Sequence, residues 1–438
     1  MRQKPVKGIK LYNQAKKFIP GGTQLLSKRP ELYLPNQWPA YFSRARGVEV
    51  WDLDGNKYID TQASIGACIL GYADPDVNQA VKNAIDKGNT STLNCPEEVE
   101  LARLLTSLHP WSDMVRYARS GGEAMAIAVR IARAYTGQDK IAFCGYHGWS
   151  DWYLASNLAS QKNLDGHLLP GLAPAGVPRG LTGTSLPFQY NKIEQLEKIV
   201  KKHKLAAIIM EPLRYQEPKN NFLSQVRAIA TKHKTILIFD EITIGWRLAL
   251  GGAHLKYKVN PDMAVFAKGM SNGYPMAAVI GRERVMQAAQ RTFISSSSWT
   301  ERLGSVAALA TIKKMRASKV QTHLNKIGRL FITALKKSAR QAKIQISFEG
   351  LPPLFIFSFN YGVKNQAVNT LFTQEMLKRG FIAVTGIDVS YALKLEHVKK
   401  YCHAAKEVFD IIKKAVAENK VGKLLHGPIA HEKFKRLT

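Results

Sequence analysis

The segment DMAVFAKGMSNGY, residues 262–274, joins an apolar run to one lysine and then to small, turn-forming residues. A short apolar run bounded by turn formers is typical of a strand that is buried on both faces of a parallel sheet. Lys268 therefore stands just past the carboxyl end of a predicted strand, where open α/β sheets place their chemistry. A desolvated lysine favours the neutral amine, a nucleophile that can form Schiff bases.

Similar apolar runs recur through the middle of the chain and alternate with helical periodicity. This alternation predicts an α/β domain with a largely parallel sheet. A helix is predicted in AMAIAVRIARAY (124–135), between the first two strands. The predicted strands are VRYA (115–118), KIAFC (140–144), LAAIIM (205–210), ILIF (236–239), MAVFA (263–267) and MAAVIG (276–281).

The two ends of the chain show a different pattern. Beyond about residue 315, the sequence predicts a smaller α+β unit, and the N-terminal 65 residues hold a DG-centred hairpin in VEVWDLDGNKYID but are too short to form a core alone. We therefore expect three segments: 1–65 and 316–438, which build a small domain, and 66–315, which forms a large one. The elements expected near the C-terminus are a helix at 323–342, strands in QISFE and LFIFSF, and helices near 366–379 and 395–419.

Composition narrows the class of protein. The chain has 438 residues, 45% of them hydrophobic, and its apolar runs fall far short of the ~20 residues of a membrane span. The N-terminus is too polar for a signal peptide. Four widely spaced cysteines suit reduced thiols in the cytoplasm better than disulfides or a metal site. We expect a soluble, cytoplasmic protein without a metal.

The formal charge of +30 is the most unusual bulk property. A field of this sign attracts nucleic acids, anionic membranes or phosphorylated metabolites. The basic residues form short, scattered clusters, and we find no RNA-recognition or zinc-finger signature. We favour a solvated basic surface over a nucleic-acid site.

The stretch RYARSGGEAMAIAVR predicts a strand that leads into a helix at Ser120, Gly121 and Gly122. Glycines let a ligand approach the backbone, and the free amides of a helix N-terminus bind anions, typically phosphate. The alternative is a serine that only caps its helix.

Two further stretches place functional side chains after predicted strands. In FCGYHGWSDWY, Tyr146 could stack on a planar ligand, whereas core packing is the alternative and His147 suits a structural role. In KTILIFDEITIGWR, Asp240 and Glu241 follow four apolar residues, and a buried carboxylate needs a cationic partner such as a protonated ring nitrogen. A phosphate cradle, a stacking aromatic, a carboxylate and an amine are the groups that pyridoxal 5′-phosphate requires.

With these motifs, and with IIMEP and FAKGMSNGYPMAAVIG, the sequence resembles the class III (ω-type) aminotransferases of the fold-type I pyridoxal-phosphate superfamily, and among them the glutamate-1-semialdehyde aminomutase-like group. The resemblance covers roughly residues 10–420. It implies a homodimer with active sites at the subunit interface.

The resemblance also implies residue roles. Lys268 matches the Schiff-base lysine and Asp240 the partner of the pyridine nitrogen. Ser120, Gly121 and Gly122 match the phosphate-binding loop, although the family more often has threonine or serine at the position of Gly122. The remaining implied cofactor contacts are Tyr146 as the stacking aromatic, Ile242 against the ring, Glu211, Gln216, and Thr300, which matches a threonine that reaches the partner subunit's cofactor phosphate.

Departures from the aminomutases bear on the substrate. An arginine that meets the substrate carboxylate in those enzymes falls near Lys28 or Arg29 here, and the C-terminal stretch FIAVTGIDVSYALKLEHV is shortened. These departures weigh against glutamate-1-semialdehyde as the substrate, and we expect amino transfer to another aldehyde or ketone, for example a sugar-derived one.

Two alternatives remain open. One is intramolecular transfer, an aminomutase reaction, which needs no second amino donor. The other is a non-catalytic binding protein on the same scaffold, against which the joint presence of Lys268, Asp240 and Tyr146 argues. A nucleotide-binding dehydrogenase is disfavoured, since no GxGxxG follows a first strand.

Overall fold

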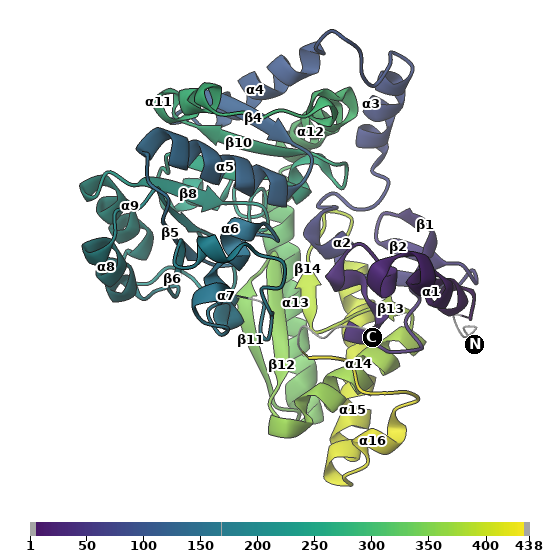
Figure 1. Ribbon diagram of the computed structural model, residues 1–438. Coiled ribbons are helices and arrows are strands. Elements are labelled where there is room, and N and C mark those ends of the chain that lie inside the picture. The colour runs from purple at the N-terminus through teal and green to yellow at the C-terminus, as the bar shows by residue number, and fades with distance from the viewer. Residues whose placement is uncertain (1–5, 168, 433–438) are drawn as a thin grey trace. The chain divides into compact units, whose positions relative to one another are not determined.

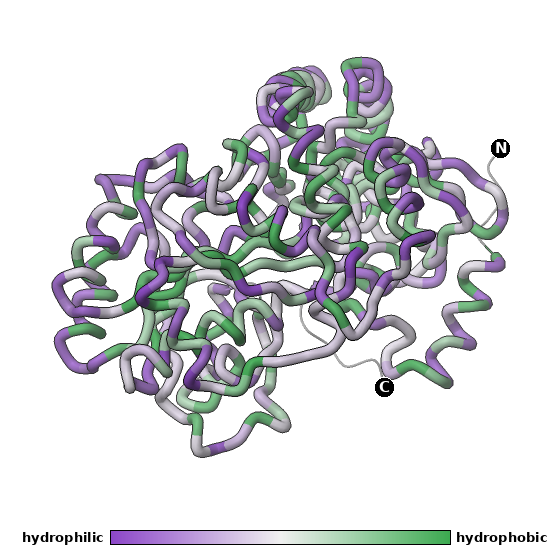
Figure 2. Tube along the Cα trace, turned by 90° about the horizontal axis from the view of Figure 1, so that it is seen from above, coloured by the Kyte–Doolittle hydropathy of each residue, from purple (hydrophilic) through white to green (hydrophobic). Residues whose placement is uncertain are grey.

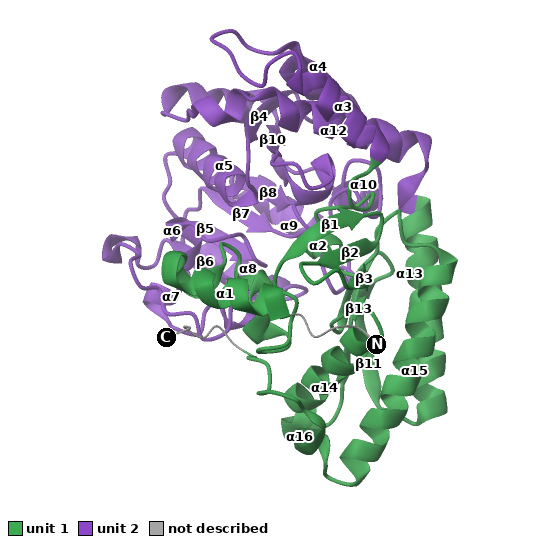
Figure 3. Cartoon of the chain, turned by 90° about the vertical axis from the view of Figure 1, so that its right-hand side faces the viewer, with its two compact units in different colours: residues 1–74, 322–438 green, residues 75–321 purple. Residues whose placement is uncertain are grey.

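The computed structural model describes residues 6–167 and 169–432. The first five residues, part of the stretch considered as a signal peptide, lie outside this range. The chain divides into two compact units (Figure 3). Unit 1 comprises residues 1–74 and 322–438, and unit 2 comprises residues 75–321.

Unit 2 is built on a seven-stranded sheet with the order β4-β10-β9-β8-β7-β5-β6. Strand β10 is antiparallel to both of its neighbours, and every other neighbouring pair is parallel. The predicted strands and the largely parallel α/β fold are confirmed. The strands are β4 (Met114–Ala118), β5 (Ile141–Cys144), β6 (Ser185–Pro187), β7 (Ala207–Met210), β8 (Ile236–Asp240), β9 (Met263–Phe266) and β10 (Ala277–Gly281).

Helices cover both faces of this sheet (Figure 1). Helix α5 (Gly121–Thr136) packs on one face, and α8 (Ile193–Lys202) and α9 (Phe222–Lys232) pack on the other. Successive strand residues alternate between the faces, so that Ile209 contacts the α5 side and Ile208 the α8 and α9 side. Helices in Figure 2 change along their length between hydrophilic and hydrophobic residues, the pattern of amphipathic helices.

The remaining helices of unit 2 pack around the sheet, and α12 contacts both α3 and α4. They are α3 (Pro75–Ile85), α4 (Pro96–Leu108), α6 (Asp151–Leu154), α7 (Ser156–Ala159), α10 (Ala253–Tyr257), α11 (Glu283–Met286) and α12 (Arg302–Ala317).

Unit 1 is built from segments at both ends of the chain. The hairpin of β2 and β3 is formed as expected, and β13, from the C-terminal segment, pairs with β3 in parallel. The N-terminal residues thus complete their sheet with a strand from the other end of the chain. The strands are β1 (Phe42–Arg46), β2 (Glu49–Asp52), β3 (Lys57–Asp60), β11 (Ile346–Leu351), β12 (Leu354–Phe359), β13 (Phe381–Ile382) and β14 (Gly386–Asp388).

The helices of unit 1 include the three that the sequence predicts beyond residue 322. Helix α15 buries Val398, Cys402 and Phe409, the face expected from its periodicity. The helices are α1 (Val6–Phe18), α2 (Ala63–Gly66), α13 (Val320–Ala342), which begins in unit 2, α14 (Asn365–Lys378), α15 (Leu395–Ala417) and α16 (Val421–Leu424).

Within residues 6–167 and 169–432, no helix is both long and apolar enough to cross a membrane. The same residues contain no cluster of histidine, cysteine and carboxylate side chains that could hold a metal ion. All four cysteines are free thiols.

Candidate active site

Lys268 lies just beyond β9, at the start of a short 3-10 turn that runs from Lys268 to Ser271. Its Nζ donates a hydrogen bond of 3.0 Å to Oγ1 of Thr243. The backbone of Lys268 has a φ of 46°, in the left-handed region that residues other than glycine rarely adopt. Such a conformation persists only where the surrounding structure holds the residue in place.

Asp240 ends β8, the strand next to β9, and only 2% of its surface is exposed. Its Oδ1 accepts the amide of Ile242 at 3.0 Å, and its Oδ2 lies 2.8 Å from Nδ1 of His147. The other ring nitrogen of His147 lies 3.2 Å from the carbonyl of Cys144. His147 is a buried, satisfied histidine, as expected, and it also positions the Asp240 carboxylate.

Tyr146 follows β5 and is held through its backbone. Its amide donates to Oε2 of Glu211 at 3.2 Å, and Oε1 of Glu211 accepts Nη1 of Arg214 at 2.8 Å. Gly145 has a φ of 113°, and a Cβ there would lie 2.7 Å from Glu211. The ring of Tyr146 is partly open to solvent and meets Tyr153 edge to face at 6.1 Å. Burial raises the pKa of the Tyr146 hydroxyl, which stays protonated at neutral pH.

Ser120 caps α5, and a helix cap is the alternative that the sequence left open for this residue. Its Oγ accepts the amide of Glu123 at 3.4 Å, and its own amide donates to the Glu123 carboxylate at 2.8 Å, which completes a capping box. Gly121 contacts Ile242, since a Cβ on Gly121 would lie 2.8 Å from Cδ1 of Ile242. This contact links the helix start to the residues that follow Asp240.

Two of the predicted cofactor-binding residues, Gln216 and Thr300, lie outside the hydrogen-bonded contacts described above. Gln216 is exposed, and within the described ranges its side chain makes no hydrogen bond to the other candidate residues. Thr300 is also exposed, and its hydroxyl donates to the carbonyl of Ser297 at 2.9 Å.

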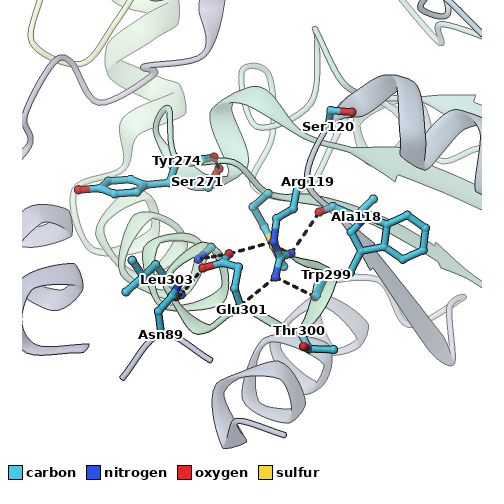
Figure 4. Close-up of polar contacts among 12 residues, drawn as sticks. Asn89, Ala118, Arg119, Ser120, Ser271, Tyr274, Trp299, Thr300, Glu301 and Leu303 are labelled. Atoms are coloured by element: carbon cyan, nitrogen blue, oxygen red, sulfur yellow. Dashed lines mark hydrogen bonds and ion pairs between the residues drawn. The ribbon is translucent and has the colours of Figure 1, made fainter. Parts of the chain in front are cut away.

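Arg119, which no sequence motif singled out, holds the segment around Thr300 in place. Arg119 donates from Nη2 to the carbonyls of Trp299 at 2.7 Å and Glu301 at 2.8 Å, and it forms an ion pair of 2.9 Å with the Glu301 carboxylate. Figure 4 shows Arg119 between Ser120 and this segment, with the Thr300 side chain well apart from Ser120. Arg119 thus ties the segment to the end of β4.

Glu241, the second carboxylate of the DE pair, has a structural partner. It is fully buried, and its oxygens accept the amides of Ala253 and His254 at 2.9 Å and lie 2.7 Å from Nδ1 of His254. These bonds satisfy the buried charge and hold the loop before α10.

Comparisons with known proteins agree on one family. The family model described as Aminotransferase class-III matches residues 34–416. The 3-aminobutyryl-CoA aminotransferase of Cloacimonas acidaminovorans (strain Evry) is 30% identical, covering 92% of this chain and 99% of that protein. A glutamate-1-semialdehyde 2,1-aminomutase of Wigglesworthia glossinidia brevipalpis is 32% identical, covering 93% and 98%.

A solved structure shares the fold. It is the PLP internal aldimine form of the FumI protein of Sphingopyxis sp. MTA144, with a TM-score of 0.85 and 23% identity over 94% of this chain and 98% of that chain.

The residues present fit pyridoxal 5′-phosphate. The first amides of α5, at Gly121 and Gly122, suit a phosphate. Asp240 and Lys268 supply a buried carboxylate and an amine at the ends of neighbouring strands. The chain belongs to the class III aminotransferases, enzymes that transfer amino groups with pyridoxal 5′-phosphate as cofactor.

Proposed function

We propose that Lys268 is the residue to which the cofactor attaches, and that the enzyme moves an amino group from a donor amine to an aldehyde or ketone acceptor. The observation that carries this proposal is the position of Lys268, beside the strand that ends in the buried Asp240, with its Nζ held 3.0 Å from Thr243.

When bound, the cofactor supplies an electron sink for the substrate carbon that loses a proton. Asp240 would hold a proton on the ring nitrogen, because a buried carboxylate stabilises a neighbouring cation. His147 keeps the carboxylate oriented through its 2.8 Å contact. The free amine of Lys268 would accept the proton that the substrate carbon loses and hold it for return, and the Thr243 hydroxyl, 3.0 Å away, would direct the amine.

The cofactor's phosphate and ring would be held by separate parts of the site. The amides of Gly121 and Gly122 would donate to the phosphate at the start of α5, the helix that Ser120 caps. Tyr146 would stack on the ring, and Ile242, which packs against Gly121, would contact it. Glu211 acts indirectly by holding the backbone of Tyr146.

We also propose a cytoplasmic homodimer in which Thr300 reaches the phosphate of the partner subunit. Its exposed side chain, on a segment fastened by Arg119, supports that assignment. Four free thiols support a reducing compartment. Sedimentation of the holoenzyme at twice the chain mass of 48.8 kDa is expected, and a monomer would count against shared sites.

The acceptor is proposed to differ from glutamate-1-semialdehyde. Arg29 packs on the PGG turn, since a Cβ on Gly21 would lie 2.6 Å from its Nη2. Lys28 instead lines a cavity of about 430 Å³ in unit 1, together with Tyr33, Trp38 and Tyr72. A lysine that met the substrate would present a point charge in place of the two parallel donors of an arginine, which supports a different acceptor, for example a sugar-derived one.

Aminomutation is the second candidate, favoured by the identity of 32% to an aminomutase. The two candidates differ in stoichiometry, because an aminomutase turns over one substrate without a second amino donor.

A donor screen on the purified holoenzyme tests the proposal. Amines are added one at a time, and the visible absorbance of the bound cofactor is followed. A donor of the enzyme should convert this band to the pyridoxamine form, and a carbonyl acceptor should restore it. Turnover of glutamate-1-semialdehyde alone would favour the aminomutase, and a band that responds to no amine would contradict amino transfer.

A further inference from the structure

The loop after Tyr146 lies directly across the first turn of α5. A Cβ on Gly148 would lie 3.2 Å from the Cα of Gly122, and Ser150 Oγ lies 3.5 Å from the Gly122 carbonyl. Between these two contacts, Trp149 places its indole nitrogen over Gly122, where a Cβ would lie only 2.8 Å from Nε1. The indole therefore occupies the space of a side chain that Gly122 lacks.

Several donors at this place have no acceptor in the protein. Within the described chain, neither Trp149 Nε1 nor the amides of Gly121 and Gly122 donate a hydrogen bond to another residue. The two amides precede the first acceptor of their helix, so they are open by geometry. The indole is 69% exposed, and its N–H is a donor only. Three donors thus gather at the positive end of a helix of 16 residues.

We propose that Trp149 Nε1–H donates a hydrogen bond to the phosphate of the cofactor, in place of a hydroxyl group on residue 122. A serine or threonine hydroxyl would be one bond from the Cβ position of residue 122, close to the place that the indole nitrogen occupies. The inference rests on the proposed cofactor site and adds a phosphate-binding residue to it. It also explains Gly122, because any side chain there would displace the indole.

The test compares two ligands that differ only in the phosphate. Apoenzyme is titrated with pyridoxal 5′-phosphate and with pyridoxal, for the parent protein and for Trp149→Phe, which keeps an aromatic ring but loses the N–H. Because the indole is largely exposed and water can replace part of its bond, we expect an affinity loss near the lower end for hydrogen bonds to charged groups, about tenfold, for the phosphorylated ligand. Pyridoxal affinity should not change.

A second variant guards against a purely structural effect. Gly122→Ser in a Trp149→Ala background, where no ring remains to clash with the new Cβ, supplies a hydroxyl near the place of the indole nitrogen and should restore most of the affinity lost for the phosphorylated ligand. Equal losses for both ligands, an unchanged affinity for pyridoxal 5′-phosphate, or no rescue by the serine would each overturn the proposal. Tight cofactor binding by the parent protein in the same titration would leave the proposed function standing in all three cases.

Discussion

His167 predicts how the site responds to acid. Its side chain is buried, and Nδ1 accepts the amide of Gly145, the residue before Tyr146, at 3.1 Å. Burial, with a smaller contribution from the nearby His147, lowers the pKa of His167 to about 4. A protonated Nδ1 could not accept this bond, so protonation breaks the contact that holds the Tyr146 loop.

The sign and size of the effect follow from linkage. In the unfolded chain the histidine takes a proton near its ordinary pKa of ~6.5, whereas in the folded protein it stays neutral until about pH 4. Between these values the unfolded state binds more protons, so stability falls as the pH falls. A difference of roughly 2.5 pKa units at 1.36 kcal/mol each amounts to about 3 kcal/mol.

The assay is the free energy of unfolding by urea, measured from pH 7.5 to pH 4.5 on the parent protein and on His167→Asn. The side-chain oxygen of the introduced asparagine would still accept the Gly145 amide, but the asparagine does not titrate. We expect the parent to lose about 2 to 3 kcal/mol more than the variant over this range. Parallel pH profiles for the two proteins would refute the reasoning.

Two further predictions concern the charged residues of unit 2. Asp240→Asn removes the buried charge that would stabilise a protonated ring nitrogen, and breaking a buried charge pair costs about 3–5 kcal/mol. We therefore expect cofactor affinity or turnover to fall by at least about 100-fold in titration and steady-state assays, and near-normal values would rule out this role. Arg119→Met removes two hydrogen bonds to carbonyls and an ion pair at a side chain that is 12% exposed. We expect the free energy of unfolding, measured with urea, to fall by about 2–4 kcal/mol. Arg119→Lys keeps the charge but not the fork of the guanidinium and should lose less; equal losses for the two variants would show that the charge alone contributes nothing.

Much of the fold is predictable because its signals are local. The apolar runs of unit 2 are long enough to mark β8 and β9, and their ends locate Asp240 and Lys268 without any knowledge of contacts. The reversed direction of β10 carries no such signal, since a strand buried on both faces has the same composition in either orientation.

The parts of the site that escaped prediction depend on contacts between distant residues. Thr243 is separated from Lys268 by 25 residues, and His147 from Asp240 by 93. Arg119 reaches Glu301 across 182 residues, and one arginine among 63 basic residues cannot be singled out by type. Thr243, a polar residue between two isoleucines, was one signal that the sequence did offer.

The central claim is that Lys268 carries the cofactor, and chemical trapping tests it most directly. The holoenzyme is reduced with borohydride, which makes an amine-linked cofactor permanent, and is then digested and examined by mass spectrometry. We expect the added mass on the peptide that contains Lys268, and none in Lys268→Ala. Attachment to another lysine in the parent protein, with Lys268 unmodified, would contradict the account.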